Sequence, residues 1–157
     1  MEITTLDKAG IDLIAKFEGC VLHPYLDSVN IPTIGIGMTY YPETGKKVTM
    51  ADHALASKDE AYRQFSLLVK PFCLSVYSTT RDDLKQHEFN ALVSLAYNIG
   101  TGGFKTSTVH RLVNEKTSGE PLKKAFLMWN KAGGKVLDGL TKRRQLEYNV
   151  YAGVTTT

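Results

Sequence analysis

One short β-rich segment in an otherwise helical chain most limits the folds that this sequence can adopt. Residues 25–41 are rich in β-branched and aromatic residues and are interrupted by glycines, a proline and an asparagine, which is typical of short strands joined by tight turns. Before this segment, apolar residues between positions 6 and 17 recur at helical spacing, and Gly19 supplies a stop directly after Glu18. The sequence therefore predicts a helix that ends at Glu18, followed by a small sheet.

The rest of the chain has helical periodicity. Residues 57–60 have the form of a capping box and begin an apolar stripe that runs until Pro71. Four further helices are predicted, the last two separated by the Gly133-Gly134 pair: residues 84–99, 107–114, 121–129 and 140–151. Only the tail at residues 155–157 is predicted to be free.

This order of elements predicts an α+β fold in which the sheet is segregated from the helices. We expect a β-lobe over residues 20–48 and a helical lobe over residues 80–154, with a ligand groove between the lobes. A chain of 157 residues with 43% hydrophobic residues has the usual size of one domain, so residues 1–157 are predicted to form a single domain.

Charge and composition limit the classes of ligand that the chain is expected to bind. The net charge of +3 favours an anionic polymer such as cell wall or nucleic acid, although solubility would explain it equally well. Basic residues are scattered rather than interleaved with aromatic residues, and no glycine-rich loop follows a strand, so nucleic acid and nucleotides are not expected partners. No signal peptide or membrane-length apolar stretch is visible, and we expect the chain to stay in the cytosol where it is made.

Cysteines and histidines give no sign of a metal or cofactor. The four histidines are not clustered, and Cys20 and Cys73 lack the spacing of a zinc or redox site. We expect two reduced, buried thiols, although a Cys20–Cys73 bond after release into an oxidising compartment stays open.

Three oxygen-bearing side chains near the β segment could support glycoside hydrolysis, which needs one group to protonate the leaving oxygen and another to serve the cation or the water. Burial at the helix end could keep Glu18 protonated, whereas Asp27 in the first β-turn would stay ionised, and Thr33 could hold a water beside it. Spacing alone does not establish this, because 16 acidic residues form many pairs. The alternatives are a surface Glu, an Asx-turn at Asp27 and an ordinary strand Thr.

The residues that flank these three positions give specific support for the interpretation as a glycoside hydrolase. The stretches Phe-Glu-Gly at 17–19, Tyr-Leu-Asp at 25–27 and Pro-Thr-Ile-Gly-Ile-Gly at 32–37 closely resemble the N-terminal signature of phage lysozymes, glycoside hydrolase family 24. In that family a Glu, eight residues, an Asp, five residues and a Thr form the catalytic set, and Glu18, Asp27 and Thr33 match at all three positions. The resemblance continues at residues 89–94, 97–102, 104–108, 129, 133–140 and 143–147.

The resemblance implies a lysozyme-like fold, with the active site in the groove, and a muramidase that cuts the β-1,4 bond between N-acetylmuramic acid and N-acetylglucosamine. The resemblance implies that Glu18 is the general acid and that Asp27, assisted by Thr33, serves the water or the developing cation. The reaction of such enzymes is regarded as inverting. Met38 stands where relatives commonly have a His, from which we expect altered packing or a lost ion pair rather than lost activity.

The same resemblance implies an endolysin that lyses the host cell. We expect a monomer without stable membrane association, which waits in the host cytoplasm until a separate holin permeabilises the membrane and then reaches the periplasm and the cell wall. The rival interpretations are a catalytically silent module that binds peptidoglycan and a lysozyme used as a bacterial toxin.

Other candidate residues lie in the helical majority. By resemblance Tyr97, Asn98 and Ser107 contact the sugar, although Tyr97 could equally be core and Ser107 could be an N-cap. An Arg from the region of Arg143 and Arg144 approaches the catalytic Glu in look-alike enzymes. The alternative is a solvated helix face on which these arginines pair with Glu147, at i+3 or i+4.

Overall fold

The structure, a computed structural model, describes residues 2–154 and divides into two compact units. Unit 1 consists of Met1–Gly10 and Phe72–Thr157, and unit 2 is Ile11–Pro71. The chain passes from one unit to the other within α1 (Lys8–Glu18) and again near the start of α3 (Lys70–Thr79). The predicted free tail lies outside the described residues. No helix in the described part is long and apolar enough to cross a membrane.

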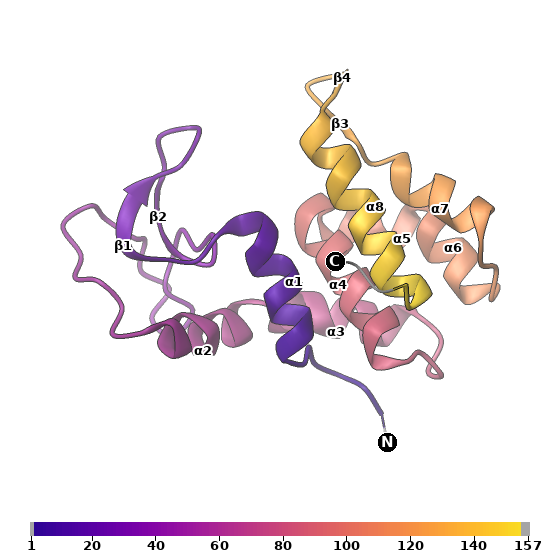
Figure 1. Cartoon of the computed structure of the whole chain (residues 1–157). Helices are drawn as coiled ribbons and strands as arrows, with labels where there is room; N and C mark the ends of the chain where they lie inside the picture. Colours follow the sequence, from indigo (N-terminus) through magenta and orange to yellow (C-terminus); the bar gives the residue numbers. More distant parts are fainter. Residues whose placement is uncertain (1, 155–157) are drawn as a thin grey trace. The chain divides into compact units, whose positions relative to one another are not determined.

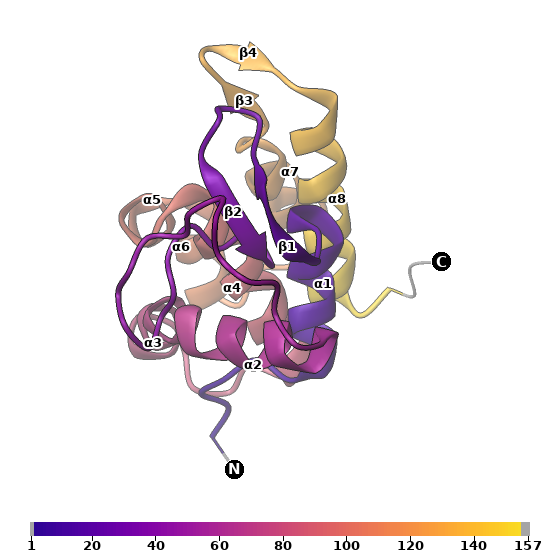
Figure 2. The ribbon, with the colours of Figure 1, turned by 90° about the vertical axis from the view of Figure 1, so that its left-hand side faces the viewer.

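Unit 2 holds the small sheet. After α1, the strands β1 (Val21–Leu26) and β2 (Pro32–Gly35) pair antiparallel, and Figure 2 shows them side by side. The predicted helix end at Glu18 is confirmed: Gly19 has a φ of +81°, and its N–H donates to the carbonyl of Ala15 at 2.7 Å. The strands begin four residues earlier than the predicted segment, at Val21.

The helix α2 (Lys58–Leu68) closes unit 2 and follows its predicted cap. The Ser57 side chain accepts a hydrogen bond from the N–H of Glu60, and the helix ends before Pro71 as expected. Its apolar face, with Ala61 and Phe65, is completely buried, as are Ile34 and Ile36 of the β segment. The helix therefore supplies apolar surface for the core that the short strands need.

Unit 1 is helical, and α8 packs against both α4 and α7 (Figure 1). Every residue of α4 from Phe89 to Ala96 is buried, so this helix forms the centre of the unit. The helices of unit 1 after α3 are α4 (Gln86–Ile99), α5 (Thr101–Thr106), α6 (Thr108–Asn114), α7 (Glu120–Leu127) and α8 (Asp138–Ala152).

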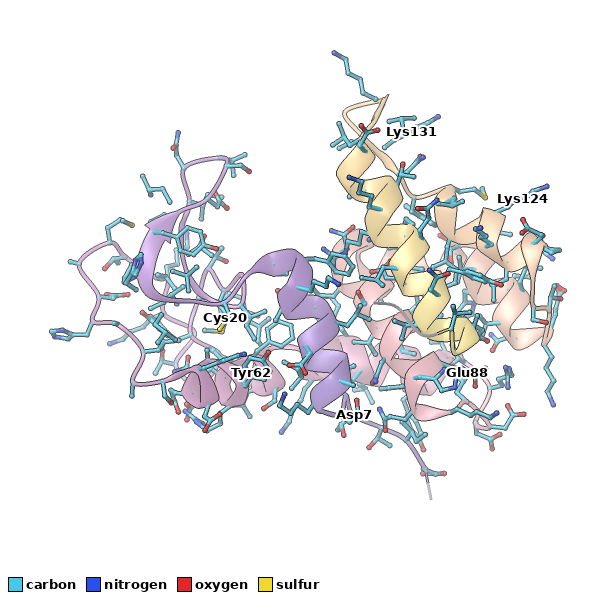
Figure 3. All side chains as sticks on the ribbon, viewed as in Figure 1. Asp7, Cys20, Tyr62, Glu88, Lys124 and Lys131 are labelled. Carbon is cyan, nitrogen blue, oxygen red and sulfur yellow. The ribbon has the colours of Figure 1, made fainter. Side chains whose placement is uncertain are left out.

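Four elements after α2 were not predicted. The helix α3 begins directly after α2, where Pro71 suggested only an end, because proline is tolerated in the first turn of a new helix. The one-and-a-half-turn α5 contains two glycines. The strands β3 (Lys131–Ala132) and β4 (Lys135–Val136) form a hairpin across Gly133 and Gly134, both at positive φ, so the expectation of a single β segment was wrong. Figure 3 shows Lys131 on this hairpin.

Candidate active site

Glu18 is the last residue of α1, and its half-buried side chain lies against the backbone of Gly37. A Cβ added at Gly37 would stand 3.2 Å from Glu18 Cβ and 3.3 Å from its Oε1, and Gly37 has a φ of +60°. A side chain at position 37 would therefore be strained and would displace the Glu18 carboxylate. The two glycines at 19 and 37 thus end the helix and leave room for the predicted acid.

Asp27 occupies the turn between β1 and β2. Its Oδ1 accepts hydrogen bonds from the N–H groups of Val29 and Ile31, each at 2.9 Å, and its carbonyl accepts one from Asn30. The Asx-turn that the sequence offered as an alternative is therefore present. It does not exclude a catalytic role, because both side-chain hydrogen bonds go to one oxygen and the residue keeps contact with solvent.

Thr33 is buried on β2, with 3% of its surface exposed, and pairs with Tyr25 across the hairpin. Its hydroxyl donates to the carbonyl of Ile31 at 2.8 Å, so its lone pairs are what remain to receive a hydrogen bond. Sequence reasoning assigned no role to Tyr25, although this residue lies in the matching signature.

The phenol of Tyr25 lies within the electrostatic influence of both predicted catalytic carboxylates. Burial is the main cause that raises its pKa, and the negative charges of Glu18 and then Asp27 raise it further. Both carboxylates are therefore electrostatic neighbours of one ring, and Thr33 lies opposite that ring on β2. The catalytic roles of Glu18, Asp27 and Thr33 stay predictions.

Two further features of unit 2 border this group. Met38 is completely buried and pairs with Ile34 through two backbone hydrogen bonds, which places it in apolar packing. An open pocket of about 560 Å³ lies beside the hairpin, lined by residues that include Pro32, Tyr40 and Lys47.

In unit 1, Arg143, Arg144 and Glu147 of α8 form a buried ionic cluster. Arg144 Nε lies 2.7 Å from Glu147 Oε1, close enough for an ion pair though not aligned as a hydrogen bond, and Arg143 Nε donates to Oε2 at 3.3 Å. Ser94 of α4 donates to the same Oε2 at 2.5 Å. Burial raises the pKa of Glu147, and the two arginines and Ser94 oppose that rise. Arg144 and Glu147 have no exposed surface, so the interpretation as a solvated face was wrong, whereas the pairing was right.

This cluster reaches the predicted substrate residues at the end of α4. Arg144 Nη2 donates to Asn98 Oδ1 at 2.7 Å, and Asn98 is exposed. Tyr97 is half-buried and packs edge-on against Phe72, with ring centroids 5.0 Å apart. Sequence reasoning missed Ser94, although Asn90, Ser94 and Asn98 form a polar stripe at one-turn spacing on an otherwise apolar helix.

Ser107 has the N-cap role that the sequence offered for it. Its hydroxyl accepts from the N–H of His110 at 3.0 Å and donates to the carbonyl of Phe104 at 2.7 Å, with 6% of the residue exposed. Contact of Ser107 with a sugar stays a prediction. The structure has Cys20 and Cys73 as free thiols, and no group of His, Cys, Asp or Glu among residues 2–154 could hold a metal ion.

Comparison with known sequences gives one family. A family model described as phage lysozyme matches residues 15–147. The endolysin of Salmonella phage P22 is 38% identical over 138 residues, which cover 88% of this chain and 91% of that protein. The endolysin of Bacillus phage B103 is 35% identical over 150 residues, 93% of this chain but 53% of that protein. The chain thus spans about half the length of the two Bacillus phage relatives that it matches.

Solved structures agree with the sequence matches. The endolysin from Escherichia coli O157:H7 phage FAHEc1 has a TM-score of 0.84 and 32% identity and covers 96% of both chains. A mutant of P22 lysozyme has a TM-score of 0.82 and 32% identity, over 96% of this chain and 99% of that one.

Proposed function

The chain belongs to the phage lysozyme family, as its sequence predicted, and from this premise we propose that it is an endolysin that hydrolyses bacterial peptidoglycan. The predicted lysozyme-like α+β fold is confirmed by the solved relatives. The proposed reaction is cleavage of the β-1,4 bond between N-acetylmuramic acid and N-acetylglucosamine, which needs no cofactor.

The observation that supports this chemistry best is that one hairpin holds Asp27 in its turn and Thr33 on its second strand, while Glu18 lies against Gly37 in the same unit. We assign to Glu18 the transfer of a proton to the glycosidic oxygen as the C–O bond breaks. Asp27, with Thr33, then takes a proton from the water that bonds to the anomeric carbon, or stabilises the cation formed there. The turn that holds Asp27 through two N–H groups suits this role, because it fixes the position of the carboxylate.

The remaining site residues are assigned supporting roles outside the catalytic set. Tyr97, Asn98 and Ser107 are assigned to contact with the glycan, and Arg143 or Arg144 to an electrostatic influence on Glu18.

The cellular route is also a proposal. Relatives named endolysin and SAR-endolysin support action on the cell wall. We propose that this chain acts as a monomer and one catalytic domain over residues 1–157, stays in the host cytoplasm until a separate holin opens the membrane, and then acts from the periplasm.

Release of reducing ends from purified, outer-membrane-stripped sacculi tests the proposed reaction. The wild-type chain should release N-acetylmuramic acid ends, Glu18→Gln should release none while keeping its circular dichroism and melting temperature, and the exposed-surface control Glu43→Gln should match wild type. An active Glu18→Gln protein would refute the assignment of the acid. Binding to sacculi without release by wild type would favour the silent binding module.

A further inference from the structure

We propose that Asn98 recognises the carbonyl oxygen of a sugar acetamido group, and that the buried pair of Arg144 and Glu147 orients Asn98 for this. The inference rests on the proposed function, since it assigns one glycan atom to one side-chain group. Its starting point is the 2.7 Å hydrogen bond from Arg144 Nη2 to Asn98 Oδ1.

The chemistry of arginine fixes the orientation of the Asn98 amide. A guanidinium has donors and no acceptor, so only the oxygen of the amide can face Arg144. The Nδ2 group of Asn98 therefore lies on the other side of the amide, on a residue that is exposed at the end of α4. Asn98 thus presents two N–H donors outward, while its acceptor is engaged.

Arg144 cannot readily change this arrangement, because two contacts and complete burial hold it in place. Its Nε pairs with Glu147 Oε1, its Nη1 donates to the carbonyl of Trp129 at 3.4 Å, and its guanidinium has no exposed surface. Glu147 is in turn fixed by Ser94 and Arg143. Reorienting the Asn98 amide would place its NH₂ group against a buried cation, which the cluster disfavours.

A pair of N–H donors selects a ligand atom that accepts hydrogen bonds. Along a peptidoglycan strand each unmodified sugar carries an acetamido carbonyl, which accepts and cannot donate, whereas a hydroxyl does both. Removal of the acetyl group leaves an ammonium, which cannot accept from Asn98 and is repelled by Arg143 and Arg144. The assigned ligand is therefore the N-acetyl form of the sugar.

The test uses Asn98→Asp in the full chain. A carboxylate at this position keeps an oxygen against Arg144 and preserves or raises the melting temperature, but it has no N–H to donate. Gln145→Glu, on the exposed neighbour of Arg144, is the control for the added charge. The substrates are native sacculi, the same sacculi after chemical N-deacetylation, and that preparation after re-acetylation with acetic anhydride.

The expected readout is a change of substrate preference. Wild type and Gln145→Glu should release reducing ends roughly five- to tenfold more slowly from deacetylated sacculi and recover on re-acetylation, as expected for one lost hydrogen bond. Asn98→Asp should be slowed by a similar factor on native sacculi and should lose the preference.

Equal rates of Asn98→Asp and wild type on native sacculi would overturn the inference, and so would an Asn98→Asp protein that keeps the full acetyl preference. Both results leave the proposed function intact. By contrast, a wild-type protein that releases no reducing ends from any of the three preparations refutes the proposed function, and this inference with it.

Discussion

Asp27 and Glu147 are both acidic residues that accept several hydrogen bonds, yet the two units hold them by different means. In unit 2, backbone N–H groups of a four-residue turn hold Asp27, and water reaches it. In unit 1, side chains of two helices hold Glu147, which has no exposed surface. A turn fixes a carboxylate without drying it, whereas a buried cluster must supply opposite charge as well.

The difference separates chemistry from architecture. A carboxylate that serves a water molecule needs access to solvent, and the turn leaves Asp27 that access. A carboxylate between two arginines links helices, and its removal leaves buried cations behind. Substitution at the first site should therefore change rates, and substitution at the second should change stability.

The largest expected effect is on turnover at Asp27. Asp27→Asn keeps an oxygen that can accept from Val29 and Ile31, so the turn is preserved, but it removes the base. We expect kcat to fall by about 10²–10⁴-fold while the melting temperature changes little. Rates of reducing-end release, measured beside thermal melts, check this. Preserved turnover would mean that Asp27 is only a turn residue.

The next effect is on the stability of unit 1. Glu147→Gln leaves Arg143 and Arg144 without their buried anion, and we expect a loss of about 3–5 kcal/mol in the free energy of unfolding by denaturant. The matched control is Glu115→Gln, which removes an exposed partner of Arg111 at 2.8 Å and should cost under about 1 kcal/mol. Similar losses for the two variants would contradict the stabilising role assigned to the buried carboxylate of Glu147.

Ser94→Ala tests one contact of the cluster without changing its charge. The Ser94 hydroxyl donates to the Glu147 carboxylate, and hydrogen bonds to charged groups contribute about 1.5–3 kcal/mol. We expect a loss in that range by chemical denaturation. Ser66→Ala, on an exposed helix turn of α2, should lose far less, because its hydroxyl donates to a solvent-accessible carbonyl.

The smallest effect concerns Glu60, a partly exposed carboxylate that accepts hydrogen bonds from two side chains. Hydrogen bonds from Arg63 and then Gln64 lower its pKa from 4.5 to about 2. Because the folded value lies below the unfolded one, its stabilisation is present above pH 4.5 and is lost as the pH falls through about 2. The difference in melting temperature between wild type and Glu60→Gln should therefore shrink from pH 6 to pH 2. A constant difference would exclude this linkage.

Local signals in the sequence predicted most of the fold. Ser57 and Ser107 were found as N-caps, and Gly19 as the end of α1, because each acts on atoms a few residues away. The strands β3 and β4 have two residues each, too few to show alternation. Charged residues are normally exposed, so the burial of Arg143, Arg144 and Glu147 was not expected from composition. The acid, the turn carboxylate and the hydroxyl came from the family signature, and their roles stay predictions.

The polar stripe on α4 also allows only one position of this helix along its axis relative to the residues that it contacts. Asn90 donates a hydrogen bond to Asp7, which is labelled in Figure 3. One turn later Ser94 donates to Glu147, and one turn after that Asn98 accepts from Arg144, so each turn of the helix has a different polar partner. A shift of α4 by one turn would place an asparagine amide opposite Glu147 instead of the Ser94 hydroxyl and would leave a buried charge without its hydrogen-bond partner. An entirely apolar stripe would tolerate such a shift. The end of α4, and Asn98 with it, is thereby located to within a single helical turn.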